Sequence, residues 1–166
     1  MNVTGAVIRL AAAEVLSLFI NMTFAGSGSA FIRLICLICT VLILAAVMAD
    51  FSIRAAGRDA KGGGSIRYRQ LICSAAAVTA LPLASWIVLA VSAKSGGFDF
   101  YGAHKLLNAP FLHFYNFIEP SASAAALSAG ELAVMLLPVF VPAAVLIAAY
   151  KASFLRIRTS AAEIQG

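Results

Sequence analysis

The amino-acid sequence predicts an all-α integral membrane protein: a bundle of four transmembrane helices with a short interfacial helical segment between the third and fourth spans. Of its 166 residues, 62% are hydrophobic and only 11% are charged. Soluble domains carry about 25% charged residues, so this chain has too few charges to cover a surface that faces water. The chain also contains four mostly apolar stretches of the length, roughly 20 residues, that crosses a hydrocarbon layer. We therefore expect a single membrane domain over residues 1–166.

The first two spans are expected at residues 4–24 and 30–49. Only residues 25–29 join them, so the pair should form a tight antiparallel hairpin. The first span contains Arg9 and Glu14, and a cleaved secretory signal peptide is the competing interpretation of this stretch. A glutamate inside the apolar region argues against cleavage.

The third and fourth spans are expected at residues 70–93 and 130–150. Residues 70–93 contain no charge. Ser128 and Glu131 precede the fourth span with the spacing of a capping box, which satisfies amides at a helix start. Prolines remove a backbone donor and crowd the preceding turn, which predicts kinks at Pro82, Pro138 and Pro142. A stripe of small residues in the third span predicts close helix packing, at Ala76, Ala80 and Ala84.

Basic residues predict the orientation. Residues 50–69 carry five of them and the segment after Tyr150 carries three. Because Lys and Arg accumulate in short cytoplasmic loops, we expect residues 50–69 to form a cytoplasmic loop, with both termini on the same side. The alanine-rich composition suggests a bacterial inner membrane. The net charge of +5 then reflects orientation and contact with anionic lipid headgroups, and no nucleic-acid partner is expected.

Polar residues form a stripe on each of the first two spans. Glu14, Ser17 and Asn21 share one helix face, and Arg33 and Thr40 share a face of the second helix. In an antiparallel hairpin, Asn21 lies level with Arg33 and Glu14 lies level with Thr40. We therefore expect the two stripes to join by hydrogen bonds.

Glu14 is the most unusual of these residues because it lies near the middle of its span. It differs in depth from Arg33 by roughly 10 Å, too far for easy pairing, so we expect it to be protonated or paired with another helix or another subunit. Intramembrane acids often mark ion pathways, which makes a proton or cation site the functional alternative. The Ala13-Glu14-Val15 segment resembles the first span of small multidrug-resistance transporters. The second span lacks that family's proline, glycine and tryptophan pattern, and we carry no function over.

The predicted outer segment, residues 94–127, is rich in aromatic residues, with seven between Phe98 and Phe117. Aromatic side chains favour the headgroup level. Residues 111–118 place His113 and Asn116 on one stripe, which predicts a short helix with a polar edge in the interface. Such a helix could also border a groove for a hydrophobic substrate.

A second candidate site lies in the same outer segment. His104 and Asn108 share a helix face, and together with His113 and Glu119 they form the cluster best suited to bind metal or move protons. Their spacing matches no metal-ligand motif, so neither a metal nor a cofactor is predicted.

The sequence names no specific activity. We favour a non-enzymatic accessory or oligomer-forming membrane subunit, with the lipid bilayer and either a protein partner or further copies of the chain as its partners. The first alternative is a small transporter or channel that uses Glu14. The second is a lipid-active membrane enzyme that uses His104, His113 and Glu119.

Overall fold

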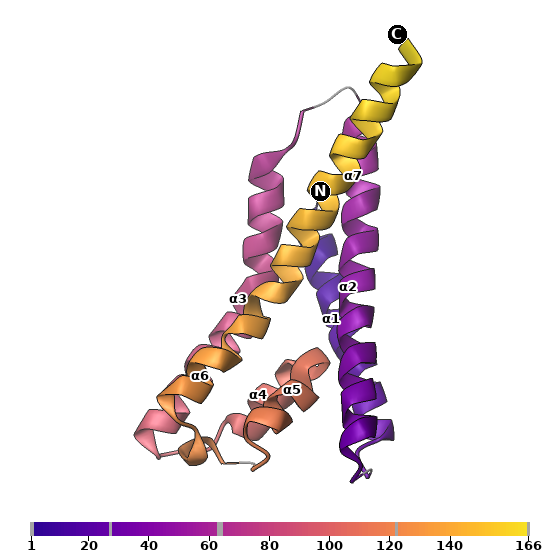
Figure 1. Cartoon of the computed structure of the whole chain (residues 1–166). Coiled ribbons are helices and arrows are strands. Elements are labelled where there is room, and N and C mark those ends of the chain that lie inside the picture. Colours follow the sequence, from indigo (N-terminus) through magenta and orange to yellow (C-terminus); the bar gives the residue numbers. More distant parts are fainter. Residues whose placement is uncertain (1, 27, 63–64, 122, 166) are drawn as a thin grey trace.

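The chain folds as an all-helical bundle, seen in a computed structural model that describes residues 2–26, 28–62, 65–121 and 123–165 (Figure 1). Helix accounts for 85% of the chain, and the described residues contain no strand. Four helical stretches are long and apolar enough to cross a membrane, as the sequence predicts: Val3–Thr23, Ala30–Lys61, Tyr68–Ser95 and Ala129–Ser160.

The helices follow one another with short connections. The first three long helices are α1 (Val3–Thr23), α2 (Ala30–Lys61) and α3 (Tyr68–Ser95). Short elements follow in α4 (Tyr101–Leu107), η1 (Ala109–Phe111), α5 (Leu112–Ile118) and η2 (Ala124–Ala126). The last stretch comprises α6 (Ala129–Met135), η3 (Leu137–Phe140) and α7 (Val141–Gln165).

Helix α2 extends well beyond its predicted end, so most of the expected loop at residues 50–69 is helical. Asp50 and Arg54 lie on its exposed side, where Arg54 Nε pairs with Asp50 Oδ1 one turn away at 2.9 Å. Its apolar residues Phe51 and Ala55 are buried on the other side. The helix ends at Lys61, with Gly62 as its C-cap; Gly63 and Gly64 lie outside the described residues.

The fourth long stretch is interrupted at one of the predicted prolines. It begins with the expected capping box, in which Ser128 Oγ accepts from the amide of Glu131 at 3.3 Å and the Ser128 amide donates to Glu131 Oε2 at 2.8 Å. The α-helix then gives way to the 3₁₀ turn η3 around Pro138, which has no N–H to donate. In contrast, α3 continues through Pro82 without a break.

The two ends of the bundle are packed differently (Figure 1). We call the end with the α2–α3 connection the linker end, and the opposite end the hairpin end. At the linker end α2 and α7 lie side by side. Tyr150 on α7 donates its hydroxyl proton to Asp59 Oδ2 on α2 at 2.8 Å. Towards the hairpin end these two helices diverge, and α4 and α5 occupy the space between them.

The segment Tyr101–Ile118, which we call the hairpin, therefore packs between the long helices, and its position relative to a membrane interface stays a prediction. Its tip η1 contacts α1 and α2, whereas α4 contacts α3. Tyr101, His104 and Tyr115 are each 0% exposed. The predicted polar edge, His113 and Asn116, faces a cavity beside the hairpin, and neither ring nitrogen of His113 has a hydrogen-bond partner among the described residues.

Candidate functional site

The base of the hairpin is closed by side chains of α4 that bind the carbonyl groups at and beyond the end of α5. The Tyr101 hydroxyl donates towards the carbonyl oxygens of Tyr115 at 3.0 Å and Glu119 at 2.9 Å. Lys105 Nζ donates to those of Glu119 at 3.2 Å and Ser121 at 2.9 Å. The last carbonyls of a helix have no partner within it, so these bonds stabilise the reversal of the chain.

Asp99 connects the start of the hairpin to the segment that follows it. Its Oδ1 accepts from the amides of Tyr101 at 3.0 Å and Ala124 at 3.1 Å. These bonds, first that of Tyr101, hold the pKa of Asp99 below its ordinary value because they favour the ionised carboxylate.

The tip of the hairpin is held by three residues of the predicted polar stripes. Glu14 Oε2 accepts from the Ala109 amide at 2.9 Å, and Asn21 Nδ2 donates to the Ala109 carbonyl at 2.7 Å. The Thr40 hydroxyl donates towards the Pro110 carbonyl at 2.8 Å. A three-residue 3₁₀ turn leaves backbone groups unpaired, and burial of such groups is costly. We call Glu14, Asn21 and Thr40 the tip clamp, because they satisfy these groups.

The two stripes thus meet the hairpin rather than each other, which corrects the expectation that they join directly. Among the described residues no hydrogen bond is found from Glu14, Ser17 or Asn21 to Arg33 or Thr40. The Ser17 hydroxyl is buried without a partner there, and Arg33 makes no ion pair. The partner of Glu14 is a backbone amide of the hairpin.

His104 and Asn108 lie together on the side of the hairpin that faces α3. His104 Nδ1 is 2.9 Å from Ser85 Oγ, and Asn108 Nδ2 donates to the His104 carbonyl at 3.0 Å. The His104 and Tyr115 rings are 4.9 Å apart between centroids. His104 Nε2 and the Tyr115 hydroxyl are buried with no partner in the described part of the chain. Ser85 could not be predicted as a partner of His104, because it lies on the third predicted span and not in the outer segment.

The other two residues of the predicted outer site lie elsewhere. His113 faces the opposite side of the hairpin, near Arg33. Glu119 lies at the base, where its Oε1 accepts from the Ser121 amide at 2.8 Å. The Ser85–His104 pair has the distance of a nucleophile and base, but no described carboxylate bonds His104 Nε2. Within the described ranges, no group of three or more His, Cys, Asp or Glu side chains is arranged to hold a metal ion.

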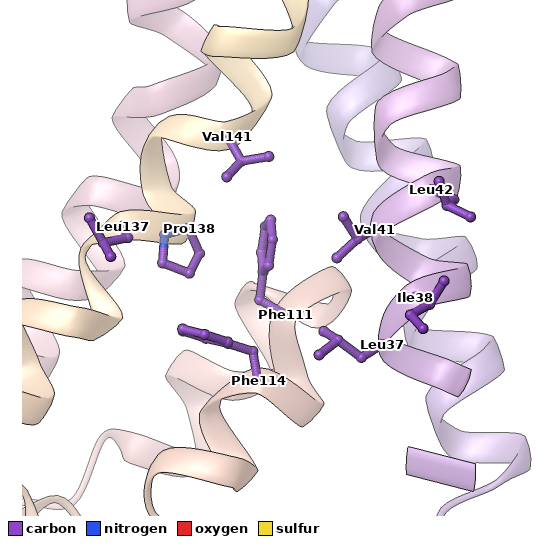
Figure 2. A pocket seen from close by; sticks show the side chains of 9 residues that line it. All are labelled: Leu37, Ile38, Val41, Leu42, Phe111, Phe114, Leu137, Pro138 and Val141. Atoms are coloured by element: carbon purple, nitrogen blue, oxygen red, sulfur yellow. The ribbon is translucent and has the colours of Figure 1, made fainter. Parts of the chain in front are cut away.

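An apolar groove opens on the side of the bundle where α2 and α7 diverge (Figure 2). It has a volume of about 490 Å³. Phe111 and Phe114 of the hairpin project into the space between α2 and the η3–α7 segment. All of its lining residues are apolar, and we call this set the lateral groove: Leu37, Ile38, Val41, Leu42, Phe111, Phe114, Leu137, Pro138 and Val141.

A second cavity of about 290 Å³ lies at the hairpin end, between the end of α1, the start of α2 and the hairpin. We call it the end pocket. Its polar lining residues are Asn21, Arg33, His113 and Asn116, and the rest of its lining is apolar. Burial, and then the charge of Arg33, lowers the pKa of His113 below its ordinary value of 6.5, so this ring is neutral at pH 7.

Comparison of the chain with protein-family models, with curated proteins and with solved structures finds no match. The geometry of the hairpin and of the two cavities therefore carries the functional argument.

Proposed function

We propose that the chain is a non-enzymatic, multi-pass protein of the bacterial inner membrane, and that its lateral groove binds one hydrocarbon chain of a lipid-like molecule. In this proposal the four long helices cross the bilayer with the linker end and both termini in the cytoplasm. The hairpin enters the membrane from the opposite side and returns to it. Non-helical backbone at membrane depth is tolerated where it is buried in protein, as the tip is by its clamp.

The apolar lining of the groove is the observation that carries this proposal. A polar ligand would lose hydrogen bonds to water in such a groove and gain none in return. A hydrocarbon chain has no hydrogen bonds to lose, and it exchanges its contacts with neighbouring lipid chains for packing contacts against two phenylalanine rings. The rim residues Ile38 and Leu137 are 50% and 65% exposed, so the groove is open on its lipid-facing side.

The groove depends on the hairpin and is more than a rough patch of helix surface. Phe111, which is only 8% exposed, forms part of it and follows directly after the clamped residues Ala109 and Pro110. The opposite wall includes Pro138, where the break between α6 and α7 occurs. Two local departures from straight helix therefore create one cavity.

Photocrosslinking to lipid tests the proposal, with a photoreactive residue at Ile38 in the groove and at Ile87 on α3 as the control. Both isoleucines are 50% exposed, and each lies eight residues from the hairpin end of its helix. We expect a lipid adduct at Ile38 that survives detergent exchange and a much weaker one at Ile87. Equal labelling at the two positions would show ordinary annular lipid and contradict the proposal.

The association role expected from the sequence is a second candidate, and one observation favours it. Ala76, Ala80 and Ala84 are exposed on α3, so this stripe of small residues is free to pack against another helix. A protein adduct at the groove, or disulfide formation between copies carrying Ala80→Cys but not between copies carrying Leu81→Cys on another exposed face of α3, would support this candidate.

The two other functions considered for the sequence stay predictions. Glu14 has a structural partner in the Ala109 amide, which explains its position without transport. Neither cavity includes Ser85 or His104, so the pair that most resembles catalytic machinery has no route for a lipid substrate through them.

A further inference from the structure

The end pocket combines a cation with buried polar groups that lack partners. His113 is 7% exposed, and neither of its ring nitrogens has a hydrogen-bond partner in the described part of the chain. Asn21 uses its amide nitrogen on the Ala109 carbonyl, whereas its Oδ1 is buried and unpartnered. This assignment of the amide follows from the carbonyl, which can only accept. Arg33 pairs with no described acid.

These groups define the chemistry of a complementary ligand. The Arg33 guanidinium calls for an anionic group, and phosphate oxygens suit its donors. The neutral His113 ring offers one N–H donor and one acceptor nitrogen. Asn21 Oδ1 needs a donor such as a hydroxyl group. The ligand should therefore carry a phosphate and a hydroxyl group close together.

The position and the remaining lining favour a lipid as the source of that phosphate. Asn21 lies two residues from the end of α1, and Arg33 is the fourth residue of α2, so the pocket lies near the level of the helix ends. Leu18, Met22 and Leu112 supply apolar surface beside the polar groups. A free inorganic phosphate ion would make no favourable contact with that apolar surface.

We propose that the end pocket binds the headgroup of an anionic phospholipid, with Arg33 and His113 donating to the phosphate and Asn21 Oδ1 accepting from a headgroup hydroxyl. The site is separate from the lateral groove, since Phe111 and Phe114 line the groove whereas Leu112, His113 and Asn116 line the pocket. Lipid binding in the groove and lipid binding in the pocket can therefore be tested, and disproved, independently of each other.

Calorimetric titration of the full-length protein in neutral detergent micelles tests this site. The probes are dihexanoyl phosphatidylglycerol, dihexanoyl phosphatidylcholine, which has neither net charge nor a headgroup hydroxyl, and inorganic phosphate. Arg33→Gln is compared with Lys94→Gln, which removes the same charge from an exposed position on the last turn of α3. We expect phosphatidylglycerol to bind more tightly than phosphatidylcholine by about tenfold or more. Arg33→Gln should abolish that preference, and Lys94→Gln should leave it intact.

Three results would overturn the proposal. Equal affinity for the two lipids would show that the pocket does not recognise the headgroup. An equal loss of affinity in Arg33→Gln and Lys94→Gln would show non-specific charge attraction. Binding of inorganic phosphate as tightly as phosphatidylglycerol, lost in Arg33→Gln, would identify an anion site but not a lipid site. The unfolding temperature of each variant in the same micelles checks that loss of binding does not come from loss of fold.

Discussion

The linker end and the hairpin end use the same two helices but hold them together in different ways. At the linker end α2 and α7 lie side by side, and both helices contribute almost completely buried side chains to the core, among them Met48, Leu146 and Phe154. At the hairpin end α2 meets the hairpin, which is fixed through the tip clamp. The linker end is stabilised mainly by close packing of side chains, and the hairpin end by hydrogen bonds to backbone groups.

This difference explains the position of the lateral groove and of the end pocket. Close packing leaves few voids, and both described cavities discussed above border the hairpin. An inserted hairpin cannot match α2 and α7 along their whole lengths, so it leaves space on either side of α5. A further hollow, lined by Arg54, Gly57, Arg58 and Lys61, lies on α2 towards the linker end. The two binding sites that we propose both lie at the hairpin end.

The largest effect is expected from a cavity at the linker end. Met48 is 0% exposed, and Met48→Ala should lower the free energy of unfolding by about 2 kcal/mol or more, since buried atoms lose their packing contacts. Met48→Leu conserves volume and should cost less. Unfolding in mixed detergent micelles measures both. A similar loss of unfolding free energy in the two variants would show that side-chain packing is not the main source of stability at this end.

A smaller effect is expected at the hairpin end, where hydrogen bonding rather than volume should matter. Glu14→Leu leaves the buried Ala109 amide without an acceptor and should cost about 1 to 2 kcal/mol. Glu14→Gln keeps a side-chain carbonyl at that position and should be close to neutral. Hydrogen exchange at the Ala109 amide should be faster only in Glu14→Leu; fast exchange in both variants would mean that the charge itself is required.

The smallest effect concerns pH at the base of the hairpin. The folded pKa of Asp99 lies below 3.8, its ordinary value, so its contribution to stability is complete above pH 3.8 and is lost as the pH falls below it. Asp99→Asn should remove this dependence. The difference in unfolding temperature between wild type and variant should therefore shrink between pH 5 and pH 2. A constant difference would show that the Asp99 charge contributes nothing.

Much of the fold is predictable from the sequence, because length and apolarity decide which helices can cross a membrane. The capping box of Ser128 and Glu131 is equally local and was correctly predicted. The helical extension of α2 from residue 50 to Lys61 was not predicted, because the charges that follow residue 49 were taken to begin a loop. An i,i+4 pair such as Asp50 and Arg54 instead supports a helix that continues beyond the apolar stretch.

The tip clamp shows a different limit. The polar stripes were visible in the sequence, yet their partners were not, because Ala109 and Pro110 contribute backbone groups that every residue type carries. Ala109 lies 88 residues from Asn21 and 95 from Glu14 along the chain. A usable signal does exist: a proline that interrupts an aromatic, apolar segment leaves backbone groups unpaired, and polar residues in nearby spans can satisfy them.

The tip clamp joins parts of the chain that are synthesised at different times. Glu14, Asn21 and Thr40 belong to the first helices to be synthesised, whereas the backbone groups that they bind are made about 70 residues after Thr40 or later. Chains are made from the N-terminus. The polar groups of the first two helices therefore lack these backbone partners until the hairpin has been synthesised. A chain that stalls before Ala109 would leave Glu14 and Asn21 without the backbone groups that they bind in the folded protein.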